Sequence, residues 1–218
     1  MSYFPFYTNI HNKTFMIIGG GTVALEKVNR LRRFTASMIV IAPHTEIEGR
    51  EVEVPRRSAD YVQILRREYR ADDLAFADYV VAATGIREVD RGVAHDCRKR
   101  KIPVNVVDDQ AYCDFIFPSI VKRGPLTIAI STSGTSPAYA MQLRRELDEM
   151  LPDEIEAILD RMGEIRADVS ARVSEQKTRA VLYKKILARL IETGNTLPQA
   201  DILRMVEQAA DDRGQKEI

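Results

Sequence analysis

The sequence has few of the residues that build disulfide frameworks and metal centres. Its two cysteines, Cys97 and Cys113, form no CxxC pair, and its three histidines show no metal-ligand spacing. Two isolated cysteines are typical of reduced thiols. We therefore expect a cytoplasmic protein without disulfides, and we assign no residue to a metal.

The sequence also lacks an excess of charge of either sign and any long apolar run. A formal net charge of zero gives no sign of a general nucleic-acid or membrane-surface binder. No apolar run approaches the roughly 20 residues that cross a bilayer, and the start of the chain lacks a signal-peptide pattern. We expect neither a nucleic acid nor a membrane among the partners.

What the sequence does contain is a strand, a glycine turn and a helix opening over residues 14–27. Within this stretch Gly19-x-Gly21-x-x-Ala24 fits the dinucleotide fingerprint. Gly19 permits a sharp turn, Gly21 lets a pyrophosphate approach the backbone, and Ala24 lets the helix pack closely on the strand. In this context the motif predicts a nucleotide site, with a purely structural glycine turn as the alternative.

A dinucleotide site usually has an acidic residue at the end of its second strand, and this sequence lacks it. The second apolar run ends at Pro43 and His44, and the first acid is Glu46. We expect the ribose to be held by the Pro43–His44 turn, by Thr45, or by Glu46 from further away. Because Arg50 lies too far on to clamp a 2′-phosphate, we favour NAD over NADP.

Strand and helix patterns alternate from Thr14 to Asp108, which predicts a parallel sheet flanked by helices. Thr84 ends the fourth strand, where its hydroxyl could bind the cofactor or cap the next helix. Asp108 ends the fifth strand on the same edge, as a turn residue or as a proton acceptor. Strands are expected near residues 14–18, 37–42, 61–69, 78–84 and 103–108.

After residue 112 the pattern changes. Two β-rich runs, residues 115–121 and 126–131, flank a turn and predict a hairpin. A two-stranded ribbon is marginal alone, so a second copy of the chain is the economical partner. We expect an α/β fold with a Rossmann-like NAD-binding domain (1–112), a small hairpin-and-helix dimerisation and substrate domain (113–150) and a C-terminal helical domain (151–218).

A hydroxyl-rich loop lies between the hairpin and the helix that follows it. Ser136 is a credible N-cap, with Pro137 at the first helical position. A loop of this kind at a helix N-terminus can bind a carboxylate or phosphate, and plain capping is the alternative. The candidate substrate-binding residues are Ser131, Thr132, Ser133, Thr135 and Ser136.

Five motifs together resemble the precorrin-2 dehydrogenase family, the dehydrogenase and ferrochelatase portion of siroheme synthase. They are IIGGGTVA (17–24), VAAT (81–84), NVVD (105–108), FIFPS (115–119) and SGTSP (133–137). The resemblance covers about Tyr3 to Pro152. It implies NAD-dependent oxidation of precorrin-2 to sirohydrochlorin and an intertwined homodimer. In some members it also implies insertion of ferrous iron.

The resemblance carries over to individual positions of this sequence. Thr22, Val23, Pro43 and His44 match the family's cofactor contacts, and Asp108 matches its catalytic aspartate. The chemistry agrees, because oxidation of a reduced tetrapyrrole needs a hydride acceptor and a base for the proton. The neighbouring acid, Asp109, could share the role. The basic residues expected to bind the substrate carboxylates are Lys122, Arg123, Arg144 or Arg145.

Two other functions stay open at this point. A bifunctional enzyme would use the same cleft to insert ferrous iron into sirohydrochlorin, although the few histidines offer little help with metal delivery. A non-catalytic NAD-sensing module is the other alternative. The NVVD motif and the hydroxyl-rich loop argue against a sensor, since it needs neither a proton acceptor nor a second anion site.

Overall fold

The computed structural model describes residues 3–34, 37–53 and 62–211. The chain forms two compact units, Met1–Phe117 and Pro118–Ile218. The first unit extends past the boundary that we expected at residue 112, because Phe115 and Phe117 pack against its core. The Phe115 ring meets Tyr79 edge-on at 5.8 Å between centroids. The further division of the chain into three functional domains stays a prediction.

The first unit is built on a sheet of six strands in the order β3-β4-β2-β1-β5-β6. All five pairings are parallel. The chain runs outward from β1 on one side and returns to β5 on the other, so the strand order reverses between these two strands. The strands are β1 (Thr14–Ile18), β2 (Ser37–Ile41), β3 (Arg50–Glu51), β4 (Val62–Leu65), β5 (Tyr79–Ala82) and β6 (Val104–Val106).

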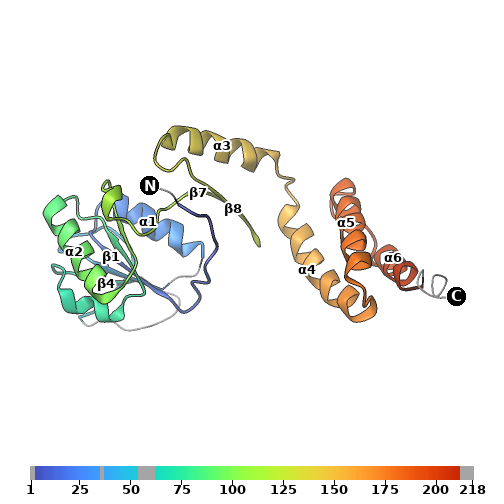
Figure 1. Ribbon diagram of the computed structural model, residues 1–218, viewed down its shortest axis with the longest axis horizontal. Helices are drawn as coiled ribbons and strands as arrows, with labels where there is room; N and C mark the ends of the chain where they lie inside the picture. The colour runs from blue at the N-terminus through green and yellow to red at the C-terminus, as the bar shows by residue number, and fades with distance from the viewer. Residues whose placement is uncertain (1–2, 35–36, 54–61, 212–218) are drawn as a thin grey trace. The chain divides into compact units, whose positions relative to one another are not determined.

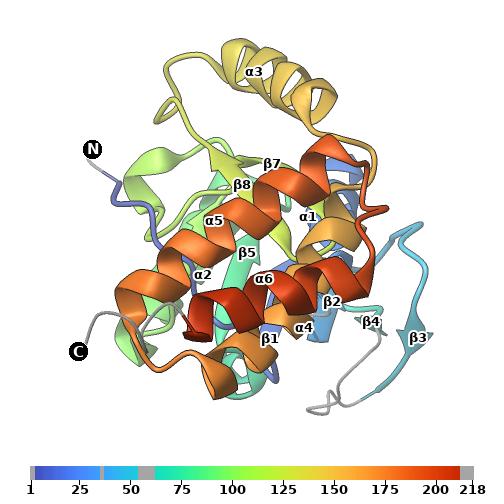
Figure 2. The ribbon, with the colours of Figure 1, turned by 90° about the vertical axis from the view of Figure 1, so that its right-hand side faces the viewer.

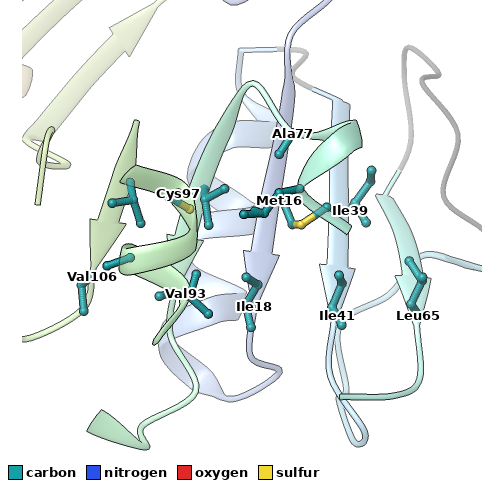
Figure 3. Packing of buried hydrophobic residues seen from close by; sticks show 14 residues of the cluster. Met16, Ile18, Ile39, Ile41, Leu65, Ala77, Val93, Cys97 and Val106 are labelled. Carbon is teal, nitrogen blue, oxygen red and sulfur yellow. The ribbon is translucent and has the colours of Figure 1, made fainter. Parts of the chain in front are cut away.

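Helices cover both faces of this sheet, which is why its central strands are apolar on both sides. Helix α1 (Thr22–Arg32) buries Ala24, Val28 and Leu31 against one face. Helix α2 (Arg87–Arg100) packs on the other, where Val93 and Cys97 contact the strands (Figures 1 and 3). Two 3₁₀ turns, Ala71–Phe76 and Gln110–Tyr112, complete the unit. The expected α/β, Rossmann-like fold is confirmed.

The second unit contains the hairpin and the remaining helices. Strands β7 (Ser119–Arg123) and β8 (Leu126–Ile130) pair antiparallel and lead to α3 (Pro137–Met150). Ser136 caps α3, as expected, because its Oγ accepts the Tyr139 N–H at 3.3 Å. Three helices, α4 (Ile155–Arg172), α5 (Gln176–Glu192) and α6 (Gln199–Asp211), share one apolar core and lie side by side in Figure 2.

Two boundaries differ from those expected. The hairpin begins at Ser119 rather than at residue 115, because the aromatic residues before it belong to the core of the first unit. The third strand, expected near residues 61–69, ends earlier, since β4 covers Val62–Leu65, and Tyr61 lies outside the described residues. None of the helices within the described part of the chain combines the length and the apolar character needed to cross a membrane.

Candidate active site

The glycine turn after β1 combines tight backbone packing with one open position. Gly19 has φ +122°, and a Cβ there would collide with the Ala83 carbonyl. A Cβ on Gly20 would likewise collide with the His44 carbonyl, whereas one on Gly21 would meet no atom within 4 Å. Gly21 is the N-cap of α1 and supplies no side chain to its N–H groups. The turn therefore leaves room for an anion at the helix N-terminus, and a dinucleotide pyrophosphate fits that opening.

One hollow, of about 480 Å³, runs from this turn to the end of β2. Thr45 connects its two sides, because Thr45 Oγ1 donates to the Gly20 carbonyl at 3.0 Å and accepts the Ile47 N–H at 3.1 Å. His44 reaches this hollow, whereas Pro43 is exposed in the turn and is not among the lining residues. The lining residues are Gly20, Gly21, Thr22, Leu25, His44, Thr45, Glu46, Ile47 and Arg66.

Arg66 is a lining residue that we did not expect from the sequence. It follows β4, whose carboxyl end lies beside that of β2. Its Nε contacts Glu51 Oε1 at 2.6 Å, and its Nη1 donates to the Thr45 carbonyl at 3.3 Å. The strand expected over residues 61–69 placed Arg66 inside that strand, whereas β4 ends at Leu65. The signal for Arg66 was its place directly after Leu65, the last residue of the adjacent strand.

A second hollow, of about 460 Å³, lies where the carboxyl ends of β1, β5 and β6 meet. Of the residues expected from the sequence, it brings together Gly21, Thr22, Val23, Thr84 and Asp108. Gly21 and Thr22 also line the first hollow, so the two hollows adjoin at the N-terminus of α1. The second hollow is lined by Gly21, Thr22, Val23, Ala83, Thr84, Gly85, Arg87, Asp90, Val106, Val107, Asp108 and Asp109.

The two adjacent aspartates at the end of β6 have different environments. Asp109 Oδ2 accepts a hydrogen bond from Arg91 Nε at 2.9 Å, and its side chain is only 14% exposed. Asp108 is exposed at the rim and has φ 59°, a left-handed conformation that aspartate tolerates. Within the described residues it makes no hydrogen bond or ion pair. Asp108 is thus the carboxylate available to a bound molecule, and Asp109 is engaged with Arg91.

The Thr84 hydroxyl is engaged within the protein. Its Oγ1 donates to Asp90 Oδ1 at 2.8 Å and accepts the Ile86 N–H at 3.0 Å. Asp90, which is 4% exposed, also accepts the Thr84 N–H at 3.1 Å. The hydroxyl therefore organises the turn that precedes α2, although the N-cap of that helix is Ile86 and no side chain makes a capping bond there. A contact with cofactor has to use its remaining lone pair.

Buried polar contacts fix the strand end that carries Asp108. Asn105 Nδ2 donates to the Phe115 carbonyl at 2.9 Å. The Cys113 thiol accepts the Val106 N–H at 3.2 Å and donates to the Val106 carbonyl at 3.1 Å. Burial raises the pKa of Cys113, so this thiol stays protonated and can donate. Asn105 and Cys113 therefore stabilise the end of β6 that precedes Asp108.

The hydroxyl-rich loop lies in the second unit and is internally bonded. Ser131 Oγ accepts the Ser133 N–H at 3.0 Å, and Thr132 Oγ1 accepts the Ser136 N–H at 3.1 Å. Together with the Ser136 cap, these bonds engage the hydroxyls of Ser131, Thr132 and Ser136 within the protein. The role of this loop in binding a substrate stays a prediction.

Among the basic residues proposed to bind the substrate carboxylates, Lys122, Arg123 and Arg144 have partners within the protein. Arg123 Nε contacts Asp148 Oδ1 at 2.9 Å, and Arg144 Nη1 lies 3.9 Å from Asp148 Oδ2. Lys122 donates to the Gly124 carbonyl. In the described ranges, no three His, Cys, Asp or Glu side chains are grouped to hold a metal ion.

The comparisons with known proteins agree with this geometry. Siroheme synthase of Pseudoalteromonas translucida is 34% identical over 200 residues, which cover 90% of this chain and 41% of that protein. Siroheme synthase of Neisseria meningitidis is 30% identical over 213 residues, 95% of this chain and 43% of that protein. The chain thus spans about two-fifths of the length of these relatives. They bear out the resemblance read from the motifs.

A solved structure titled SirC, precorrin-2 dehydrogenase, has the same fold. It superposes with a TM-score of 0.66 at 19% identity and covers 95% of this chain and 98% of that one. Residues 123–150 match a family model described as sirohaem biosynthesis protein central. Residues 6–119 match the model described as putative NAD(P)-binding. Since that match spans more than half of the chain, the chain belongs to the putative NAD(P)-binding family.

Proposed function

We propose that the chain catalyses the NAD-dependent oxidation of precorrin-2 to sirohydrochlorin in siroheme biosynthesis, with Asp108 as the general base. The observation that carries this proposal is that Asp108 lines one cleft with the glycine turn and Thr84. The relatives named siroheme synthase and the structure titled precorrin-2 dehydrogenase support the choice of substrate. The cytoplasmic location that we expected belongs to the same proposal.

In this proposal, separate residues bind the cofactor and accept the proton. A bound nicotinamide supplies the hydride acceptor. The glycine turn and the N-terminal N–H groups of α1 hold the pyrophosphate. Asp108, exposed at the rim of the cleft, takes the proton that the substrate loses. Asp109 stays paired with Arg91 and does not compete for this role.

The first hollow favours NAD over NADP. Glu46 lines it and would repel a 2′-phosphate. Arg66, the cation that could offset this charge, is engaged with Glu51 and with the Thr45 carbonyl. Within the family's general NAD(P) binding we therefore infer a preference for the unphosphorylated cofactor. A kcat/KM with NADP equal to that with NAD would contradict it.

The hairpin of the second unit favours a homodimer. Within the described residues, β7 and β8 pair only with each other, and an isolated two-stranded ribbon is marginal in water. A second copy would supply further strands that pair with this hairpin. In the same proposal, residues 131–136 bind the substrate. We predict a particle of twice 24.7 kDa in light scattering after size exclusion. A monomer at micromolar concentration would remove this proposal.

The test of function is a direct assay with a matched variant. Purified protein is mixed with NAD and precorrin-2, and the absorbance bands of NADH and sirohydrochlorin are followed. Asp108→Asn is the variant of choice, because asparagine also tolerates the left-handed backbone at this position. We expect turnover to fall by about 10²- to 10⁴-fold, with an NAD affinity close to that of the wild type.

The same assay separates the alternatives. NAD binding by the wild type without turnover would favour a sensing module. Ferrous or cobaltous ion added to sirohydrochlorin then tests the chelatase. Loss of both turnover and NAD binding in Asp108→Asn would mean that Asp108 is structural.

A further inference from the structure

Arg66 is held at the first hollow by two contacts from two different parts of the chain. Its Nε donates to Glu51 Oε1 on β3 at 2.6 Å, and its Nη1 donates to the Thr45 carbonyl at 3.3 Å. Thr45 is itself bonded to the glycine turn, because its Oγ1 donates to the Gly20 carbonyl at 3.0 Å. The guanidinium of Arg66 is thus connected to the backbone that opens the cofactor site.

These contacts leave the flat faces of the guanidinium free of hydrogen bonds. The N–H groups of a guanidinium lie in its plane, so bonds made by Nε and Nη1 fix the plane without covering either face. The Arg66 side chain is 43% exposed, and it lines the hollow. A planar ring that enters the hollow can therefore stack on a guanidinium that is already oriented.

The other lining residues suit a nucleotide base better than a phosphate. Leu25 and Ile47 line the hollow with apolar side chains that pack in the core of the first unit. Glu46 adds a carboxylate, which repels a phosphate. The described lining residues include no Phe, Tyr or Trp. His44 is planar too, but no hydrogen bond, ion pair or ring contact within the described residues orients its side chain.

The order of the two hollows assigns an end of the cofactor to each. They adjoin at Gly21 and Thr22, at the N-terminus of α1. A dinucleotide whose pyrophosphate lies at this point extends one nucleoside into each hollow. The second hollow contains Asp108, the proposed base, so it receives the reacting nicotinamide end. The first hollow is then left to the adenosine end.

We propose that Arg66 binds the adenine ring of the cofactor by stacking its guanidinium on the face of the base. This inference deepens the proposed function, since it assigns a residue to the adenosine end of the same cofactor. Stacking needs the planar group as well as the charge. A lysine at this position would keep the charge and lose the plane, so it should not replace the arginine.

The first test measures how the intact chain binds the two halves of NAD, by calorimetric titration. Arg66→Ala should weaken ADP binding by about 5- to 10-fold and leave the binding of nicotinamide mononucleotide unchanged. Arg66→Lys should weaken ADP binding nearly as much. Arg100→Ala removes a guanidinium that is 40% exposed and paired with Asp72, and it should bind ADP like the wild type. Wild-type ADP affinity in Arg66→Ala, or its full recovery in Arg66→Lys, would overturn the proposal.

The second test separates stacking on the base from capture of a 2′-phosphate. Arg66→Ala should weaken the binding of 5′-AMP and of adenosine 2′,5′-bisphosphate by the same factor, because both carry the same base. A larger loss for the bisphosphate would assign Arg66 to the phosphate and overturn the proposal, as would a wild type that does not bind ADP. If the wild type binds ADP but lacks dehydrogenase activity, the proposed function fails while these titrations still decide the role of Arg66.

Discussion

At the scale of single residues, two glycines of one turn have separable roles. Gly19 has φ +122° and lies against the Ala83 carbonyl, so its role is to permit the backbone conformation of the turn. Gly21 borders open space at the start of α1, where we propose that the cofactor binds. A stability measurement and a binding measurement should therefore respond to different substitutions.

Gly21→Ala should weaken NAD binding by about tenfold, with little change in melting temperature, because the new methyl occupies the space of the pyrophosphate. Gly19→Ala should lower the free energy of unfolding by about 2 kcal/mol or more, since alanine is strained at this φ and its Cβ collides with the backbone. Calorimetric titration with NAD and urea unfolding check the pair. Wild-type affinity in Gly21→Ala would remove this turn from the site.

Sequence patterns could locate the rim residues but not their partners. Gly21, Thr84 and Asp108 share one cleft because parallel strands end at one edge, a rule that needs no coordinates. The engagement of Thr84 with Asp90 depends on how the turn enters α2. Arg66 meets Thr45 only because β4 lies beside β2, and strand adjacency is not written in local sequence.

At the scale of elements, α2 contains a titratable group on its buried face. Cys97 is fully buried in the core cluster that also contains Ala94, and Figure 3 shows it near Val93 on the same helix. Burial, assisted by Asp96 and Asp114, raises the pKa of the Cys97 thiol to about 12. The folded state therefore retains a proton that the unfolded chain releases above the ordinary value of 9.0.

Stability should consequently fall as pH rises from 9 toward 12, because in this window the folded state binds more protons than the unfolded one. Between about pH 7.5 and about pH 10, Cys97 should account for a loss of about 1 kcal/mol. Urea unfolding of Cys97→Ala at both pH values should show a smaller decline, whatever the cost of the substitution itself. The residual decline is expected from Tyr69 and Cys113, whose pKa values are also raised. An identical slope in the variant would contradict the assignment.

Elements with continuous patterns were predictable, and short or context-dependent ones were not. The apolar runs at β1, β2 and β5 are typical of strands covered on both faces. Strand β3 has only two exposed residues, Arg50–Glu51, and carries no pattern of its own. Residues 115–118 resemble a strand by composition, yet their aromatic rings pack onto the core instead, because β-propensity measures fit to a surface.

At the scale of the whole molecule, strand–helix alternation is lost after Asp108, and a second compact unit begins at Pro118. The exact boundary between the two units could not be predicted from the sequence. Phe115 and Phe117 belong to the first unit because of their packing, and no turn signal in the sequence marks this. The helical character expected of residues 151–218 is confirmed for the described residues, since α4, α5 and α6 each bury one face in a common core.

Each unit is one uninterrupted stretch of chain, so the backbone passes between them once, at Phe117–Pro118. Proline restrains the residue before it to extended conformations, which gives this crossing a defined local geometry. The segment of the gene that encodes either unit can therefore be exchanged at a single junction. The nucleotide-binding half and the half that carries the hairpin are thus open to independent evolution by recombination.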